Sequence, residues 1–487
     1  MRRLTLAELA SSVAADPLDG AACSLTTDRV TTDSRQVRPG DLFWALPGER
    51  FDGHEFVAEA FAAGAVAAVV CRDFAWGEPS LNSTRPSPLP LSPRGEGRGV
   101  GGEGCVLLRV DDTRQALGRF AAWYRRSCRA KVIGVTGSVG KTSTREAIYA
   151  VLSQRYAGVR SLQNFNNEIG VPLSLLELGP EHEFAVIELG ASGPDEIRQL
   201  AEIAQPQIGV ITAVGAAHLD GFGSIEGVAR AKAELVTALG RNGTAMLNAD
   251  DFRVRTIGEA ARCGVLWYGS NDGPLWLFAR GHDFVAGGES STFMCDGGRR
   301  IKLNVPGRHQ MYAALAAVAV GRWFGLADRD IAAGLENFRT PAMRCQVERL
   351  GGVTWINDAY NASPLSMWAA LDMLCEWPTS GRRVLVCGDM KELGPAGAEF
   401  HRRLGEEIAC CHTVDFCVAV GPLSVEVAAT ARQCGMASES MVHCESIDKA
   451  TDVLGQKLRA GDVVLVKASR AMQLERVLIG LRQPLAA

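Results

Sequence analysis

A glycine-rich loop that ends in a lysine and a threonine is the clearest chemical signal in the sequence. The stretch GVTGSVGKTS runs from Gly134 to Ser143, between an apolar run and a stretch of helical composition. Glycines between a strand and a helix let backbone N–H groups and the helix dipole converge on an anion. In such a loop Lys141 can reach the β- and γ-phosphates of a nucleotide, and the hydroxyl of Thr142 can bind Mg²⁺. The loop therefore predicts a nucleotide-binding site.

The spacing of this loop departs from the usual phosphate-loop pattern, which has a glycine, four free positions and then Gly-Lys-Ser/Thr. The first glycine belongs where Val135 stands, and glycines lie on either side at Gly134 and Gly137. The loop can be a damaged nucleotide site, a glycine-rich turn with a solvated lysine, or another version of the phosphate loop. Its place between a strand and a helix favours a phosphate site over the solvated turn.

Three more side chains of chemically useful types follow the loop along the chain. Glu188 ends an apolar run, His218 follows another, and Lys232 lies in the helical stretch RAKAELVTAL. A carboxylate at the end of a buried strand is well placed to bind Mg²⁺. Taken alone, each has an ordinary alternative: a solvated carboxylate, a structural histidine and a lysine on a solvated helix face.

Alternating apolar runs and helical patterns define the elements that must position these residues. We expect buried strands at residues 131–136, 184–188, 208–214 and 244–248. A second series begins after Pro341, with strands at residues 353–357, 383–387, 415–420 and 462–467. Strands that alternate with helices predict parallel sheets covered on both faces. Loops that follow such strands are where α/β proteins gather the polar groups of their sites.

Length and composition indicate a soluble protein of several domains. A chain of 487 residues is too long for one hydrophobic core and predicts about three domains. The net charge of −4 argues against a nucleic-acid partner. The sequence shows no CxxC pair, no signal-peptide core and no apolar run of membrane-spanning length. We expect a cytoplasmic protein with no membrane insertion.

One segment, PSLNSTRPSPLPLSPRGEGRGVGGEG at residues 79–104, has a composition unlike the rest of the chain. Pro, Ser, Arg and Gly dominate it, and such a stretch cannot bury enough apolar area to order itself. Apolar runs at residues 65–71 and 105–110, which we interpret as strands, flank the segment. We predict a disordered insertion within a loop of the first domain.

The glycine loop resembles that of the Mur ligases, whose pattern TG-[ST]-x-GK-[TS] has this spacing. Other stretches resemble the family's motifs, in the family's order, over nearly the whole chain. They are NFNNEIGVPLSLL (164–176), IELGASGPDEI (187–197), AAHLDGFGS (216–224), AKAEL (231–235), NDAYNASPLSM (357–367), CGDMKELG (387–394) and GDVVLVKASR (461–470). Several motifs in register make the resemblance specific, so the loop is identified as a different version of the phosphate loop.

The resemblance implies an α/β protein of three domains. Residues 1–127 would form a small α/β domain that binds the UDP part of a substrate. Residues 128–342 would form a central parallel-sheet P-loop ATPase domain, and residues 343–487 a C-terminal Rossmann-like domain. The glycine loop then belongs to the central domain.

The resemblance also implies a reaction. Mur ligases build the stem peptide of bacterial cell-wall precursors, and they use ATP to join an amino acid or a dipeptide to a UDP-linked substrate. NDAYNASPLSM and GDMKELG resemble the branch that joins D-Ala-D-Ala to UDP-N-acetylmuramoyl-tripeptide through an acyl phosphate. The DNPR-type motif that is typical of the preceding ligase does not occur in the sequence. A folylpolyglutamate synthase and a non-catalytic nucleotide-binding regulator are the alternatives.

The family's ATP and metal sites map onto matching positions of this chain. The resemblance implies two Mg²⁺ sites, with Thr142, Glu188, His218 and Lys232 around them. Lys232 would react with CO₂ to form a carbamate, which changes a cation into an anion that supports the second Mg²⁺. Lys141, His218 and Lys232 would be the catalytic residues. The implied ATP contacts are Gly137, Ser138, Val139, Gly140, Lys141, Thr142, Ser143, Arg344, Asp358 and Asn361.

The resemblance places other residues at the UDP-linked substrate and at the incoming D-Ala-D-Ala. They are Ser34 and Arg35, within the stretch at residues 31–65, and Asn166, Asn167, Tyr360, Lys467, Ser469 and Arg470. One departure concerns the base of ATP, because the family's GRHNxxNALAA is GRHQMYAALAA here. Gln310 and Ala313 replace two asparagines, one of which meets adenine in the family, so the sequence leaves base recognition open. We expect a monomer.

Overall fold

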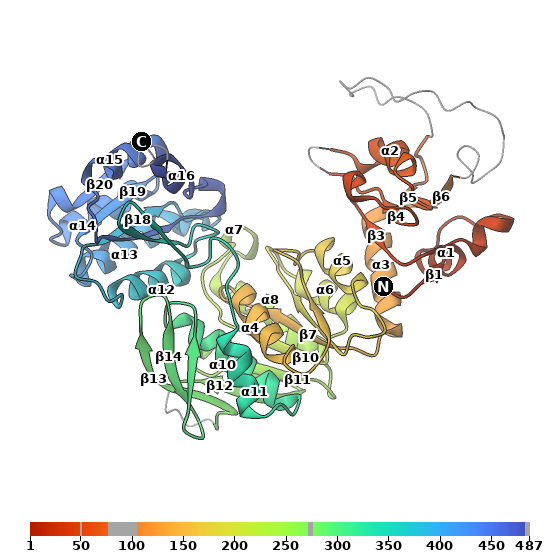
Figure 1. Ribbon diagram of the computed structural model, residues 1–487, viewed down its shortest axis with the longest axis horizontal. Helices are drawn as coiled ribbons and strands as arrows, with labels where there is room; N and C mark the ends of the chain where they lie inside the picture. The colour runs from red at the N-terminus through yellow and green to blue at the C-terminus, as the bar shows by residue number, and fades with distance from the viewer. Residues whose placement is uncertain (49–50, 76–104, 271–275, 483–487) are drawn as a thin grey trace.

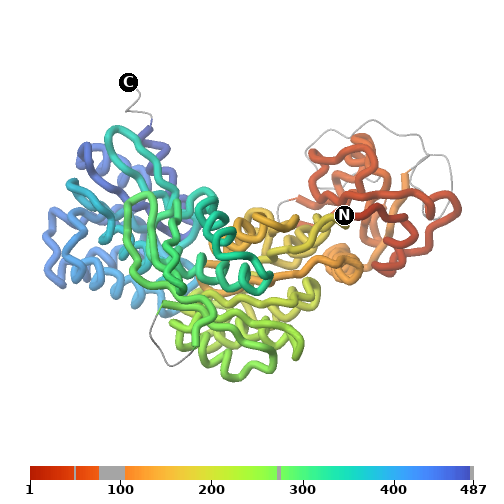
Figure 2. Tube along the Cα trace, turned by 60° about the horizontal axis from the view of Figure 1, so that its bottom comes forward, coloured from red at the N-terminus to blue at the C-terminus, as the bar shows by residue number. Residues whose placement is uncertain are grey.

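The computed structural model describes residues 1–48, 51–75, 105–270 and 276–482. Its elements form three groups along the chain, and Figures 1 and 2 show the C-terminal group against the central group, on the side away from the N-terminal group. The predicted insertion at residues 79–104 lies outside the described residues. In the described part of the chain, no helix is both long enough and apolar enough to cross a membrane.

The N-terminal group is built on a four-stranded parallel sheet in the order β3-β4-β5-β6, beside a small antiparallel pair of β1 and β2. Its elements are β1 (Leu4–Thr5), α1 (Leu6–Val13), β2 (Thr26–Thr27), β3 (Val30–Thr31), β4 (Leu42–Trp44), α2 (Val57–Ala62), β5 (Ala67–Cys71), β6 (Val106–Val110) and α3 (Thr113–Ser127). Helix α3 begins where the carboxylate of Asp112 accepts hydrogen bonds from two backbone N–H groups of its first turn.

The central group contains a nine-stranded sheet in the order β15-β14-β13-β12-β11-β10-β7-β9-β8, which is parallel from β8 to β13 and antiparallel beyond. Its strands are β7 (Lys131–Thr136), β8 (Gly158–Arg160), β9 (Phe184–Glu188), β10 (Ile208–Ile211), β11 (Thr244–Asn248), β12 (Gly264–Gly269), β13 (Ala279–Ala286), β14 (Ser291–Cys295) and β15 (Arg299–Leu303). Its helices are α4 (Lys141–Leu152), α5 (Gly170–Leu176), α6 (Glu196–Ala204), α7 (Leu219–Phe222), α8 (Ile225–Ala238), α9 (Phe252–Glu259), α10 (His309–Trp323) and α11 (Asp328–Glu336).

The C-terminal group contains a six-stranded sheet in the order β16-β17-β21-β18-β19-β20, in which only β16 runs antiparallel to its neighbour. Its strands are β16 (Gln346–Leu350), β17 (Val353–Asn357), β18 (Arg383–Gly388), β19 (Phe416–Val420), β20 (Met441–Cys444) and β21 (Val463–Lys467). Its helices are α12 (Pro364–Cys375), α13 (Gly397–Cys410), α14 (Ser424–Gln433), α15 (Ile447–Lys457) and α16 (Arg476–Arg482). The α/β class expected from the sequence is confirmed.

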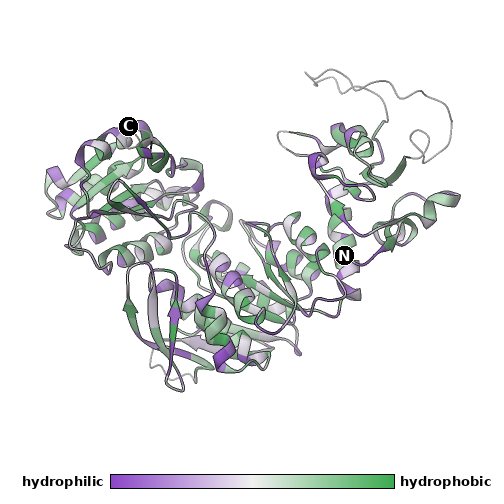
Figure 3. Ribbon diagram, in the orientation of Figure 1, coloured by the Kyte–Doolittle hydropathy of each residue, from purple (hydrophilic) through white to green (hydrophobic). Residues whose placement is uncertain are grey.

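The continuous apolar runs became buried strands, and Figure 3 shows apolar residues concentrated along the sheets. The strands predicted at residues 131–136, 184–188, 244–248 and 353–357 coincide with β7, β9, β11 and β17. The run predicted at 208–214 ends earlier, at Ile211, because the following residues turn toward the glycine loop, where the N–H of Ser138 donates to the carbonyl of Ala213 at 2.8 Å. The antiparallel strands β13 to β15 were not predicted, because polar residues alternate with apolar ones in them.

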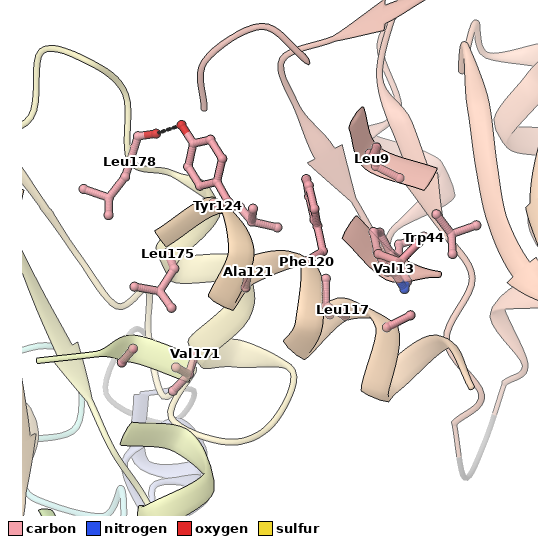
Figure 4. Packing of buried hydrophobic residues seen from close by; sticks show 14 of the residues in the cluster. Leu9, Val13, Trp44, Leu117, Phe120, Ala121, Tyr124, Val171, Leu175 and Leu178 are labelled. Carbon is pink, nitrogen blue, oxygen red and sulfur yellow. Dashed lines mark hydrogen bonds between the residues drawn. The ribbon is translucent and has the colours of Figure 1, made fainter. Parts of the chain in front are cut away.

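Helix α3 joins the N-terminal group to the central group through a shared hydrophobic core (Figure 4). Its Phe120 stacks on Trp44 of β4 at 5.8 Å between ring centroids. Its Tyr124 donates from the phenol to the carbonyl of Leu178, just after α5, at 2.5 Å. The same buried cluster includes Val171 and other residues of α5 and α6. These contacts hold the N-terminal sheet on the central group.

We propose domain boundaries near residues 127 and 342. The first boundary follows the end of α3 at Ser127, and the second precedes β16, which starts the C-terminal sheet at Gln346. Each of the three larger sheets then falls within a single domain.

Candidate functional site

A cavity of about 800 Å³ lies between the central and C-terminal groups. Its central wall comes from the start of α4, the start of α10 and the segments that follow β9, β10 and β11. Its C-terminal wall comes from residues just before β16, from the segments after β17 and β18, and from the end of β21. Carboxyl ends of parallel strands meet here from two sheets, which is where α/β proteins bind ligands.

The glycine loop is held against the end of β10. Gly137 and Gly140 have positive φ angles of 148° and 81°. A Cβ at Gly137 would lie 1.9 Å from the hydroxyl oxygen of Thr212, so only glycine fits there without a shift. The Thr212 hydroxyl donates to the carbonyl of Val139, and the ammonium of Lys141 donates to the carbonyl of Gly137 at 2.9 Å. The loop therefore has a fixed shape at the N-terminus of α4, where an anion is favoured.

The carboxylate of Glu188 lies buried beside this loop. Its Oε2 accepts from the Thr142 hydroxyl at 2.9 Å and from Arg145 at 3.3 Å, and its Oε1 accepts from the Asn166 amide at 3.0 Å. Hydroxyl and carboxylate oxygens are the hard ligands that Mg²⁺ prefers. Thr142 and Glu188 are thus a donor set that fits Mg²⁺, at the position where a nucleotide phosphate would approach the loop.

His218 and Lys232 occupy different positions relative to the cavity. His218 lines it at the start of α7, and its Nδ1 pairs with the carboxylate of Glu392 from the C-terminal group. Burial lowers the pKa of His218, while Glu392 opposes that change. Lys232 is 2% exposed on α8, behind the lining, with its ammonium 5.4 Å from the ring centre of Phe222. Burial, followed by the charge of Lys141, lowers the pKa of Lys232 to about 7.

The second metal site and the carbamate on Lys232 stay predictions. Among the described residues, no group of three or more His, Cys, Asp and Glu side chains is arranged to hold a metal ion by itself. A lysine with a pKa of about 7 has a large neutral fraction at neutral pH, and a neutral amine is the form that reacts with CO₂.

The C-terminal wall brings five of the sequence-predicted residues together. Asp358 accepts from the ammonium of Lys467 at 2.5 Å, and Lys467 also donates to the carbonyl of Asn361 at 3.0 Å. The guanidinium of Arg344 lies 4.0 Å from the ring centre of Tyr360. Arg344 is flanked by Met343 and Cys345, which have φ angles of 58° and 52°. Left-handed backbone at two non-glycine residues is costly, and it is typical of functional segments.

The part of the cavity near α10 contains the two residues that depart from the family's pattern. Gln310 and Ala313 are buried and line the cavity together with His309 and Tyr312. The amide Nε2 of Gln310 lies 3.0 Å from Nε2 of His309. Burial lowers the pKa of His309 to about 4, so its imidazole is neutral at pH 7 and Nε2 can accept from the amide. His309, Gln310 and Tyr312 are thus polar side chains that line the cavity around Ala313, the position where the family has an asparagine.

Several sequence-predicted residues are not among those that line the cavity. Gly137 lies beneath the lining and Ser469 is buried, with its hydroxyl accepting from the N–H of Lys391 at 2.8 Å. Arg470 is exposed and pairs with Glu475 at 2.6 Å. Ser34 and Arg35 belong to the N-terminal group, where Arg35 is exposed and pairs with Asp33 at 2.8 Å. Asn166 and Asn167 line the cavity from the segment before α5.

The sequence motifs did not single out Arg145 or Glu392, although both contact predicted site residues. Arg145 follows Thr142 by three positions on α4, so the helical period could have indicated that the two share a face. Glu392 lies within the motif CGDMKELG, but its contact with His218 joins two separate groups. No local sequence signal indicates such a contact.

Three models of the Mur ligase family match the chain: the middle domain over residues 135–321, the glutamate ligase domain over 343–470 and the catalytic domain over 26–95. The UDP-N-acetylmuramoyl-tripeptide–D-alanyl-D-alanine ligase of Bacillus subtilis is 35% identical over 455 residues, which cover 92% of each chain. The ligase of the same name from Escherichia coli is 35% identical over 496 residues, which cover 99% of each chain.

Solved structures match over similar lengths. A crystal structure of MurF from Acinetobacter baumannii has a TM-score of 0.82 at 30% identity and covers 99% of both chains. The MurF ligase of Thermotoga maritima in complex with ADP has a TM-score of 0.76 at 29% identity, with 94% of this chain and 98% of that chain covered. A folylpolyglutamate synthase of Mycobacterium tuberculosis has a TM-score of 0.56 at 16% identity, which indicates a shared fold alone.

Proposed function

The chain belongs to the Mur ligase family, and from this premise we propose that it uses ATP to join D-Ala-D-Ala to UDP-N-acetylmuramoyl-tripeptide in the synthesis of peptidoglycan precursors. The observation that carries the proposal is the cavity in which a phosphate loop, a buried carboxylate and the C-terminal polar residues face one another. Relatives named for this reaction support the substrates, and the MurF ligase solved with ADP supports the nucleotide.

The first step would transfer the γ-phosphate of ATP to the terminal carboxylate of the tripeptide. Two anions must approach one another, so positive groups have to offset their repulsion. The N–H groups of the loop and the N-terminus of α4 would hold the phosphates, with Lys141 and Arg344 facing them from the two walls. Mg²⁺ held by Thr142 and Glu188 would supply further charge neutralisation. The resulting acyl phosphate has a good leaving group.

The second step would be attack by the amine of D-Ala-D-Ala on the acyl phosphate. A C–N bond forms, the C–O bond to phosphate breaks, inorganic phosphate leaves and the amine loses a proton. We assign Asp358 and Asn361 to the nucleotide, and Tyr360, Lys467, Ser469 and Arg470 to the dipeptide side of the C-terminal group. Walls from two groups would shield the acyl phosphate from water, which otherwise hydrolyses it.

The UDP-linked substrate would extend from the cavity toward the N-terminal group. Asn166 and Asn167 line the cavity and are assigned to the end that carries the reacting carboxylate. Ser34 and Arg35, on the exposed turn after β3, are assigned to the UDP end. The shared core around α3 would keep the two ends of this long substrate in register.

A carbamate on Lys232 would change the electrostatics of the site in the required direction. In the unmodified chain, the positive charge of Lys141 disfavours the cationic form of Lys232 and, after burial, is the next cause of its lowered pKa. Attack of the neutral amine on CO₂ forms an N–C bond, releases one proton and leaves an anion. The repulsion would become an attraction, and the new carboxylate oxygens would suit a second Mg²⁺ on the side of His218.

Phosphate release with UDP-N-acetylmuramoyl-tripeptide, measured with and without D-Ala-D-Ala, tests the function. The ligase should release phosphate only when ATP, Mg²⁺, the tripeptide and the dipeptide are all present. A folylpolyglutamate synthase would respond to a folate and glutamate instead. A non-catalytic regulator would bind ADP in calorimetry but would release no phosphate with any of these substrates.

We also propose the cytoplasm as the place of action and a monomer as the working form. ATP and UDP-linked precursors are substrates of the cytoplasm. Both walls of the cavity come from one chain, so the reaction does not call for a second subunit. Sedimentation of the purified protein at working concentration tests the monomer.

A further inference from the structure

Arg145 lies in the interior beside the site, where a guanidinium is unusual. Its side chain is 2% exposed, and arginine is almost never so buried unless it is paired. It lies in the first turns of α4, three positions after Thr142, so that both side chains project from the same face of the helix. The phosphate loop ends before Arg145 and does not account for it.

Three acceptors from different parts of the chain surround this guanidinium. Nε and Nη2 donate to Oε1 of Glu146 at 3.0 and 2.7 Å. Nη1 donates to the backbone carbonyl of Gln163 at 2.5 Å and to Oε2 of Glu188 at 3.3 Å. Arg145 thus links helix α4, the segment before α5 and the end of β9. The planar fork of arginine suits this task, because its N–H groups point in several fixed directions.

The contact with Gln163 holds the segment that carries the asparagines of the site. Gln163 has a φ angle of 44°, a left-handed conformation that a non-glycine residue keeps only when its surroundings compensate for it. Three residues later, Asn166 donates to Oε1 of Glu188 at 3.0 Å. Both oxygens of Glu188 are therefore fixed, one by Asn166 and the other by Thr142 and Arg145.

We propose that Arg145 is a positioning residue, which orients the carboxylate of Glu188 toward Mg²⁺ and keeps the segment 163–167 in the shape that lines the cavity. This proposal rests on the proposed function. Glu146 supplies a counter-charge, so the guanidinium can orient Glu188 without adding its full positive charge beside the metal. Residues that orient a metal ligand commonly change metal affinity or activity by about 10- to 100-fold when they are replaced.

The test compares Arg145→Lys and Arg145→Met with the matched control Arg160→Met. Arg160 also pairs with Glu146, at 2.9 Å, but it packs over the ring of Tyr149 and stands away from the cavity. Calorimetry measures the affinity for ADP with and without Mg²⁺, and kinetics measures the Mg²⁺ concentration for half-maximal turnover. Mg²⁺ increases the affinity of the parent for ADP by a certain factor. In both Arg145 variants this factor should be smaller by about tenfold or more. Arg160→Met should stay within about twofold of the parent on the same measure.

Arg145→Lys separates geometry from charge, because lysine keeps the charge and loses the fork. A lysine variant that matches the parent would overturn the positioning role. Tighter Mg²⁺ binding by Arg145→Met would overturn it too, since the guanidinium would then compete with the metal. A lower melting temperature with an unchanged Mg²⁺ dependence would reduce Arg145 to a structural residue. If Arg145→Met does not fold, Arg145→Lys decides. A parent without ligase activity would contradict the proposed function, whereas the ADP calorimetry would still decide the role of Arg145.

Discussion

Replacing Lys232 by methionine should stabilise the protein at neutral pH while it abolishes turnover. Burial lowers the pKa of Lys232 from 10.5 to about 7, with the charge of Lys141 as the next cause. One pKa unit corresponds to about 1.4 kcal/mol, so keeping this lysine in the folded protein at pH 7 costs roughly 4 kcal/mol. Methionine has a similar length and no charge, and Phe222 lies close to its position. Most of this cost should therefore disappear in Lys232→Met.

The stabilisation should depend on pH in a defined direction. The pKa of Lys232 in the folded protein lies below its unfolded value, so between pH 7 and 10.5 the unfolded chain binds more protons. The free energy of unfolding of the parent therefore rises with pH across this window. The free-energy cost of burying the Lys232 ammonium is fully present below pH 7 and absent above pH 10.5. Lys232→Met should raise the melting temperature by several degrees at pH 7, and by much less near about pH 9.5.

Scanning calorimetry in CO₂-free buffer, which keeps the amine unmodified, measures both effects. The matched control is Lys131→Met, which replaces an exposed lysine at the start of β7 and should change the melting temperature little at either pH. A Lys232→Met protein that is no more stable than the parent at pH 7 would refute the desolvation of this amine. An equal rise in melting temperature at both pH values would also contradict the desolvation of this amine, because the added stability would then come from the packing of methionine.

Four further changes test separate contacts. Lys141→Met should lower turnover by about 10²-fold or more, and near-normal phosphate release would contradict the phosphate-loop assignment. Lys232→Ala should be inactive, and formate or acetate added in trans should restore part of the turnover, whereas full activity without acid would exclude a carbamate. Gly137→Ala places a Cβ 1.9 Å from the Thr212 hydroxyl and should abolish ADP binding in calorimetry; unchanged affinity would show that the loop does not hold phosphate. Tyr124→Phe removes a 2.5 Å hydrogen bond between α3 and the central group and should cost about 1–3 kcal/mol in chemical unfolding with little change in turnover.

The sequence by itself determined the glycine loop, the buried strands and the α/β class. These features depend on residues that are neighbours along the chain. Strands that are buried on both faces need continuous apolar runs, which is why residues 131–136 and 184–188 were predicted with the right bounds. The strands β13 to β15 have alternating exposure and sit at the end of the sheet, so the same criterion missed them.

Only the tertiary structure decided how the site is assembled. Glu188, Arg145 and Asn166 come from β9, α4 and the segment before α5, and their hydrogen bonds span 43 and 22 positions of the chain. His218 meets Glu392 across two groups of elements. The low pKa of Lys232 likewise depends on the burial of its side chain on helix α8 and on the charge of Lys141, which is distant in sequence. Local patterns fix which residue types lie on a strand or helix, but desolvation and contact distance depend on how those elements pack against one another.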